Sequence, residues 1–211
     1  MEPERILIAD DHVVLRAGIK HILKNELPGM EFGEAASAVE VFRMVRNKKW
    51  NILILDINLP GRNGLDILNQ LKDERIGIPV LVFSVYREEI VAVRAFKAGA
   101  SGYLSKDAAG TELVKAIHQL LAGRRYITIP VAELMASQLE NPENKSPHER
   151  LSDREYQTLL HIASGFTLSQ IAFKLSLAIS TISTYRARIL EKTGLKNNAG
   201  LTHYAIDNKL I

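Results

Sequence analysis

Five polar side chains of this 211-residue chain lie at or just after the ends of short apolar runs. They are Asp10, Asp11, Asp56, Ser84 and Lys106. If these runs are parallel strands of one sheet, their carboxyl ends meet at one edge, and all five side chains converge there. Any one of them has a simpler role, such as a helix cap or a solvated loop residue. Five of them at the strand ends of one sheet favour a common site.

The chemistry of such a site follows from its charges. Carboxylates that lie this close repel one another unless a cation lies between them. A hard divalent cation with oxygen ligands, Mg²⁺ by preference, suits the cluster and keeps several waters. The backbone carbonyl of Asn58, two residues after Asp56, is a further candidate ligand. A metal beside a carboxylate and a lysine stabilises a phosphoryl group while the carboxylate attacks it. The product is an acyl phosphate, a labile linkage suited to signalling.

The elements that position these residues alternate between strand and helix. Three apolar, β-branched-rich runs indicate strands buried on both faces of a parallel sheet, at 5–9, 51–55 and 79–83. Weaker strands are expected at 31–35 and 102–105. Helical patterns lie near 13–26, 38–48, 64–74, 87–98 and 110–122. This (βα)5 order predicts an α/β fold, a doubly wound five-stranded parallel sheet with right-handed crossovers.

Residues 4 to about 124 resemble the receiver domain of two-component response regulators. The resemblance is carried by Asp10-Asp11, the run 55–61 followed by Gly64, Ser84, and the run 99–106. It implies Asp56 as the phosphoacceptor, Asp11 and Asp56 as Mg²⁺ ligands, and Asp10 as a ligand through water. It also implies that Lys106 pairs with the phosphoryl group and that Ser84 and Tyr103 form a switch pair. One departure is Asp107, which stands where many receivers have Pro.

Two domains joined by a linker are expected. Residues 140–149 are nearly devoid of apolar side chains and contain two Pro, so they bury almost nothing. The expected division is a receiver domain over 1–125, a linker over 126–150, with room for a short helix at 130–139, and a second domain over 151–211.

The second domain has the pattern of a small four-helix domain. Ser152 and Glu155 form a capping box, and Gly165 ends the first helix. Thr167 or Ser169 starts the second helix, and Ser180 or Thr181 starts the third. The third helix buries its apolar stripe and presents hydroxyls and arginine on the opposite face, which is typical of a helix-turn-helix. A helical bundle that binds protein is the alternative.

The motifs of residues 151–194 resemble the LuxR-type DNA-binding domain, and its pairing with a receiver is similar to the NarL/FixJ class of response regulators. The motifs are the runs 151–155, 162–167, 170–172, 180–182, 185–189 and 192–194. The resemblance implies that the third helix enters the major groove and that the fourth, at about 199–208, helps to pair two domains. Two departures are Ser183 and Tyr185, where many members have Lys and His.

Contacts to double-stranded DNA are expected from the second and third helices of this domain. We expect contacts mainly to phosphates from Ser169, Gln170, Thr181, Arg186 and Lys192. We expect contacts to base edges from Ser183, Thr184 and Arg188, which lie opposite the buried stripe. Residues 151–211 hold 7 basic and 4 acidic residues, a net charge of +3, which is a weak footprint of a nucleic-acid binder.

The sequence therefore predicts a phosphorylation-controlled transcriptional regulator and not an enzyme, apart from its own phosphoryl transfer and dephosphorylation. Its expected partners are a sensor histidine kinase, DNA, a second copy of the chain, and RNA polymerase as a further candidate. A cytoplasmic location is expected, because the chain has no signal-peptide pattern and no membrane-length apolar run. The absence of Cys excludes disulfides and thiol chemistry. One rival is a phosphatase of the haloacid dehalogenase type, in which an Asp would normally stand at Asn58. The other is a regulator that works without phosphate.

Overall fold

The computed structural model describes residues 3–60, 62–86, 88–108, 110–140 and 146–211. The chain divides into two compact units, Met1–Ala136 and Ser137–Ile211.

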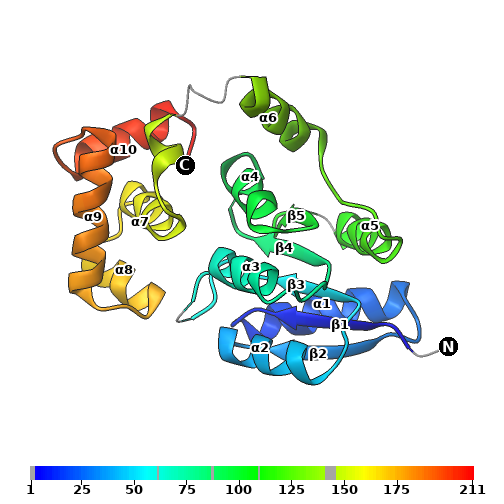
Figure 1. Ribbon diagram of the computed structural model, residues 1–211. Coiled ribbons are helices and arrows are strands. Elements are labelled where there is room, and N and C mark those ends of the chain that lie inside the picture. Colours follow the sequence, from blue (N-terminus) through cyan, green and yellow to red (C-terminus); the bar gives the residue numbers. More distant parts are fainter. Residues whose placement is uncertain (1–2, 61, 87, 109, 141–145) are drawn as a thin grey trace. The chain divides into compact units, whose positions relative to one another are not determined.

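A five-stranded parallel sheet forms the centre of the first unit. Its strands are β1 (Arg5–Ala9), β2 (Glu31–Ala35), β3 (Ile52–Leu55), β4 (Val80–Ser84) and β5 (Gly102–Ser105). Their order in the sheet is β2-β1-β3-β4-β5, and every neighbouring pair is parallel (Figure 1). The predicted doubly wound sheet is confirmed, and the reversal of strand order lies at β1 and β3, where such sheets bind ligands.

Five helices connect and cover these strands. They are α1 (Val13–Glu26), α2 (Ala38–Asn47), α3 (Gly64–Asp73), α4 (Glu88–Ala98) and α5 (Gly110–Leu121). The side chains of a strand alternate between the two faces of its sheet. One face packs against α1 and α5, where Ile8, Ile54 and Phe83 of the strands join Leu23 and Ile117 in one buried cluster. Because both faces are covered, the central strands are apolar throughout, as the sequence indicated.

A sixth helix, α6 (Ile129–Glu140), lies within the segment expected to be a linker. The sequence left room for a short helix over 130–139, and the structure has one that is slightly longer. The middle of the expected linker, residues 141–145, lies outside the described residues.

The second unit is helical. A short 3₁₀ helix, η1 (Pro147–Arg150), precedes α7 (Asp153–Ala163), α8 (Leu168–Leu175), α9 (Ile179–Thr193) and α10 (Asn198–Asp207). Helix α7 packs against α8, α9 and α10 (Figure 1). Buried aliphatic side chains of all four helices form its core, among them Leu159, Ile171, Ile182, Ile189 and Leu201. The four helices and the tight turn between α8 and α9 confirm the predicted helix-turn-helix domain.

The start of α9 differs from the sequence prediction. Ser152, Thr167 and Asn197 cap the neighbouring helices with their side chains, as residues of these types commonly do. Helix α9 begins at Ile179, after Ala178, which makes no side-chain capping bond. The turn before α9 determines this starting point. Ser176 takes the left-handed conformation with φ of 52° and ends α8, so that α9 begins three residues later.

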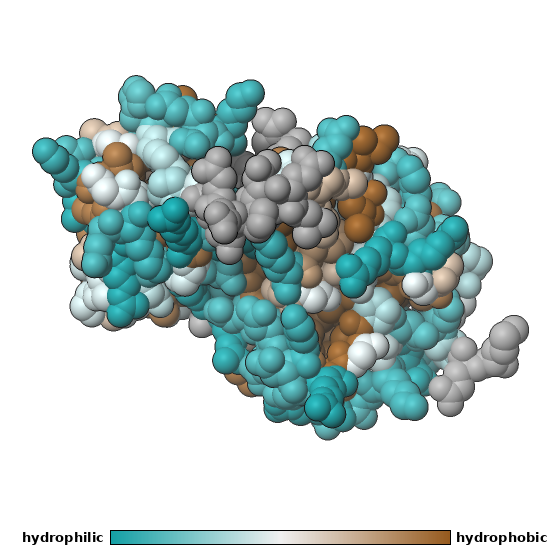
Figure 2. Space-filling model, turned by 45° about the horizontal axis from the view of Figure 1, so that its top comes forward, coloured by the Kyte–Doolittle hydropathy of each residue, from teal (hydrophilic) through white to brown (hydrophobic). Residues whose placement is uncertain are grey.

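No helix in the described part of the chain is long and apolar enough to cross a membrane. Hydrophilic residues cover most of the molecular face shown in Figure 2, with smaller apolar patches between them.

Candidate functional site

The carboxylates predicted to converge lie together. Asp10 follows β1, and Asp56 follows β3, its neighbour in the sheet. Asp10, Asp11, His12 and Asp56 each offer a ligand atom, and these atoms all lie within 4.8 Å of one another. Asp10 and Asp56 are buried, whereas Asp11 and His12 are exposed. The two buried carboxylates therefore form the inner side of the cluster, and the two exposed residues form a side that is open to solvent.

Lys106, which follows β5, reaches into this cluster. Its Nζ lies 2.6 Å from Asp10 Oδ2 and 2.8 Å from Asp56 Oδ2. Burial works to lower the pKa of Lys106, but the carboxylates of Asp56 and Asp10 outweigh it and hold the pKa above its ordinary value. Burial raises the pKa of Asp56, and the ammonium of Lys106 opposes that rise. One cation thus faces two buried carboxylates, and the cluster keeps an excess of negative charge.

One oxygen of Asp56 has no hydrogen-bond partner within bonding distance among the described residues. Asp56 Oδ2 bonds to Lys106, but Asp56 Oδ1 is buried and lacks a hydrogen-bond partner among the described residues. A buried acceptor without a partner costs about 1–3 kcal/mol, and more when it is charged. A divalent cation with oxygen ligands would remove that cost. The donor set therefore fits Mg²⁺, with Asp10, Asp11 and Asp56 as the side chains that would hold it.

Two residues near this cluster were not identified from the sequence. Arg16 on α1 is buried, and its guanidinium donates to the carbonyl of Asp10 at 2.7 Å and to Glu34 Oε2 at 3.1 Å. His12 Nδ1 lies 2.7 Å from Asp11 Oδ1 and 3.0 Å from Asp10 Oδ1. Arg16 fixes the backbone that carries the acidic pair. Its spacing from Asp10, six residues along the chain, was the available signal, since it places Arg16 one turn into the following helix.

Gly64 allows α3 to begin close to Asp56. A Cβ atom at Gly64 would lie 2.7 Å from the carbonyl oxygen of Asp56 and 2.8 Å from Cα of Ile57. The amide of Gly64 donates to the carbonyl of Ile57 at 2.8 Å. A glycine is therefore needed for the loop after β3 to close against its own helix.

Ser84 and Tyr103, the predicted switch pair, lie at the ends of the adjacent strands β4 and β5. Ser84 is fully buried, and Tyr103 is 1% exposed. The phenol of Tyr103 donates to the carbonyl of Tyr86 at 2.8 Å, and burial raises the pKa of Tyr103. The structure thus places the Tyr103 ring inside, beneath the loop that follows Ser84.

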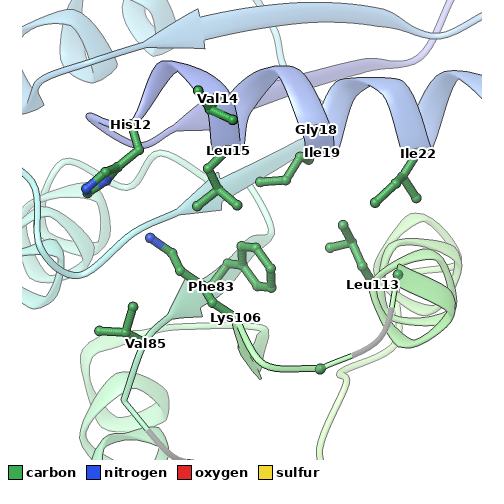
Figure 3. A pocket seen from close by; sticks show the side chains of 12 residues that line it. His12, Val14, Leu15, Gly18, Ile19, Ile22, Phe83, Val85, Lys106 and Leu113 are labelled. Carbon is green, nitrogen blue, oxygen red and sulfur yellow. The ribbon is translucent and has the colours of Figure 1, made fainter.

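An apolar pocket of about 500 Å³ adjoins the cluster. Helix α1 lines one side with Leu15 and Ile22, and Phe83 and Leu113 face it from the sheet and from α5 (Figure 3). His12 and Lys106 lie at the end of the pocket that is nearest to the carboxylates. The charged cluster therefore borders an accessible aliphatic surface.

In the second unit, most residues predicted to contact DNA are exposed. Ser169, Gln170, Ser183, Thr184, Arg188 and Lys192 are exposed, and Thr181 and Arg186 are half-buried.

Four of the eight have side chains with a partner among the described residues. Thr184 donates to the carbonyl of Ser180 at 2.9 Å. Gln170 accepts from the amide of Thr167 in the capping box of α8. Arg186 donates to Asn198 on α10. Lys192 lies 2.6 Å from Oε2 of Glu155.

Comparisons with known proteins agree with both halves of this description. The response regulator receiver domain model matches residues 6–118, and the model of the luxR family of bacterial regulatory proteins matches residues 149–205. The response regulator UvrY of Escherichia coli K12 is 34% identical over 97% of this chain and 94% of its own. The response regulator GacA of Pseudomonas aeruginosa is 33% identical over 98% of this chain and 97% of its own.

A solved structure has the same fold. RcsB of Salmonella enterica serovar Typhimurium, bound to the rprA promoter in the presence of the phosphomimetic BeF₃⁻, aligns over 96% of this chain and 98% of its own. The TM-score is 0.66 and the sequence identity is 23%. Together with a receiver sheet that carries the acidic cluster and a helix-turn-helix unit, these matches show that the chain belongs to the two-component response regulators with a luxR-type DNA-binding domain, a family of DNA-binding transcription regulators of the NarL/FixJ class.

Proposed function

We propose that Asp56 accepts a phosphoryl group from a sensor histidine kinase and that the phosphorylated chain binds double-stranded DNA as a homodimer. Asp10, Asp11, Asp56 and the backbone carbonyl of Asn58 hold Mg²⁺. Residues 1–125 act as the receiver, 126–150 as the linker and 151–211 as the DNA-binding domain. The step under control is transcription by RNA polymerase, and the compartment is the cytoplasm, because it holds the DNA.

The unpartnered Oδ1 of Asp56 supports this proposal most directly. It belongs to a buried carboxylate whose other oxygen is held by Lys106, so the side chain cannot turn freely. The cluster thus holds one carboxylate oxygen of Asp56 in a set orientation, without a hydrogen-bond partner among the described residues, beside two further carboxylates.

The chemistry is a displacement at phosphorus. An oxygen of Asp56 forms a P–O bond while the bond between phosphorus and the donor's leaving group breaks, and the leaving group takes the electron pair. Bound Mg²⁺ supplies positive charge to the phosphoryl oxygens. Lys106 already contacts both buried carboxylates and supplies a second positive charge to the same oxygens. Ser84 then turns its hydroxyl to the new phosphoryl group, and Tyr103 stays in the space behind it.

Intact-mass spectrometry with acetyl phosphate and Mg²⁺ tests the assignment. The wild type should gain one phosphoryl group, and Asp56→Asn should gain none. Asp107→Asn is the matched control, because it removes an exposed carboxylate next to Lys106 and should label as the wild type does. Equal labelling of the wild type and Asp56→Asn would show that the acceptor is another residue. Continuous turnover of a phosphate ester would instead favour a phosphatase.

The α9 helix is the part of the second unit that best suits DNA. Among the helices α7 to α10, all within the described residues 146–211, α9 is the one without a side-chain cap. Its first backbone N–H groups therefore remain available to a phosphate oxygen. Ser183, Thr184 and Arg188 lie on its exposed side. We assign these three residues to base edges, and Ser169, Thr181 and the first turn of α9 to phosphates.

A further inference from the structure

The exposed face of α9 is nearly free of charge. Ser180, Thr184, Ala187 and Glu191 follow one another at helical spacing and are all exposed, opposite the buried Ile182 and Ile189. Arg188 and Ser183 lie at the sides of this face. The charges of Arg188 and Glu191 cancel, and both residues belong to the second half of the helix. On this face, its first two turns therefore offer hydroxyl and aliphatic groups and no charge.

The basic residues next to this face are engaged elsewhere. Arg186 donates to Asn198 on α10, and Lys192 donates to Glu155 on α7. Arg, Lys, Asn and Gln are the side chains that read guanine and adenine by paired hydrogen bonds. None of these types lies on the exposed face between Ile179 and Ala187, because Arg186 is turned to α10. The first turns of a recognition helix contact the bases. In α9 these turns lack the side chains that could bind a purine by paired hydrogen bonds.

The apolar groups on this face have a matching feature in DNA. The hydroxyl of Thr184 donates to the carbonyl of Ser180 at 2.9 Å, which commits its proton to the helix and leaves its methyl group for contact. Ala187 adds a second exposed methyl group, and the side chain of Ile179 is 53% exposed at the start of the helix. In the major groove, thymine alone carries a methyl group, and small apolar side chains contact it.

We propose that α9 recognises its DNA site mainly through the 5-methyl groups of thymine, with Thr184 and Ala187 as the residues that contact them. Arg188 then reads at most one flanking base. This inference rests on the proposed function, because it requires α9 to lie in the major groove.

Replacement of thymidine by deoxyuridine tests the proposal, since it removes the methyl group and leaves every hydrogen-bonding atom in place. A binding site is first selected from random duplexes with the full-length chain in the presence of beryllium fluoride. Each thymidine of that site is then replaced singly, and the affinity is measured by fluorescence anisotropy. We expect a loss of about fourfold at one or two positions in each half-site, as for the burial of one methylene-sized group.

A matched pair of variants tests whether Thr184 is the residue that contacts the thymine methyl group. In Thr184→Ser the hydroxyl stays and the methyl group is lost, so deoxyuridine should no longer weaken binding at one of those positions. Thr202→Ser is the control, because Thr202 makes the same bond to the carbonyl four residues earlier, on α10. It should keep the full effect of deoxyuridine.

The outcomes separate the two proposals. Specific binding that no deoxyuridine weakens would overturn thymine recognition and leave DNA binding intact. A deoxyuridine effect that is equal in the wild type and Thr184→Ser would overturn the role of Thr184. A selection that enriches no sequence would overturn the proposed function itself, and the inference with it.

Discussion

Lys192 on α9 makes an ion pair with α7 that the sequence pattern of α9 did not predict. Its Nζ lies 2.6 Å from Oε2 of Glu155, a side chain only 3% exposed that also accepts from the amide of Ser152. Burial acts to raise the pKa of Glu155, but Lys192 and Ser152 outweigh it and hold the pKa below its ordinary value. The ion pair joins the start of α7 to the end of α9, so it fixes the helix that we assign to DNA.

Lys192→Met should therefore lower the stability of the second unit. We expect a loss of about 1–3 kcal/mol, because a buried carboxylate loses its charged donor but keeps its backbone bond. Urea unfolding followed by circular dichroism measures it, with Lys196→Met, at an exposed lysine nearby, as the control. If stability is unchanged and the salt dependence of DNA binding falls by about one unit instead, Lys192 is a phosphate contact.

At the scale of single elements, the strands and helices of the receiver were largely predictable. The strand range 5–9 agrees with the structure because an aliphatic run buried on both faces leaves little alternative. The ranges 31–35 and 102–105 have no β-branched residue, and they agree because each lies between two predicted helices of the (βα)5 order. The convergence of Asp10, Asp56 and Lys106 followed from the sheet topology alone.

Features that depend on tertiary contacts were not predictable in this way. The start of α9 depends on the left-handed Ser176, a conformation that non-glycine residues adopt only where packing supports it. Lys192 contacts Glu155, which is distant in sequence. Arg16 contacts the carbonyl of Asp10, and this contact depends on how the chain turns between β1 and α1. Sequence periodicity does not predict the contact of Lys192, and the spacing from Asp10 was the available signal for Arg16.

His161 gives α7 a pH-dependent stability. Burial, aided by Lys174, lowers the pKa of His161 to about 4, and its Nε2 has no partner among the described residues. The unfolded chain, with an ordinary histidine pKa of about 6.5, binds a proton that the folded unit resists. This contribution to stability is therefore complete above pH 6.5 and is lost as the pH falls toward 4.

We expect the stability of the wild type relative to His161→Leu to fall by about 3 kcal/mol between pH 7 and pH 4. Urea titrations by circular dichroism at several pH values measure this difference. Trp50, the single tryptophan, reports the first unit separately by fluorescence. His203→Gln, at an exposed histidine of the same unit, should keep the pH dependence of the wild type. Parallel curves for the wild type and His161→Leu would contradict the prediction.

At the scale of the whole molecule, a chemical change in the receiver has to alter DNA binding by a second domain. The acidic cluster and the helix-turn-helix belong to separate compact units. In the function that we propose, a phosphoryl group at Asp56 would therefore act on α9 through a change in the population of states, such as monomer and dimer. Because the face of α9 holds few charges, one domain alone should bind DNA weakly. Pairing of two domains would then supply the affinity that electrostatics does not.

Phosphorylation should shift the full-length chain toward a dimer. In the proposed mechanism the Ser84 hydroxyl would gain a hydrogen bond to a charged group only in the phosphorylated state. Such a bond is worth about 1.5–3 kcal/mol, which changes a population ratio by roughly ten- to a hundredfold. Light scattering over a concentration series, with and without beryllium fluoride and Mg²⁺, measures the shift. Ser84→Ala should blunt it, whereas Ser105→Ala, at a less buried serine on the neighbouring strand, should not. Equal mass distributions with and without beryllium fluoride would rule out dimerisation as the output, and release of the DNA-binding domain would then be the mechanism to test.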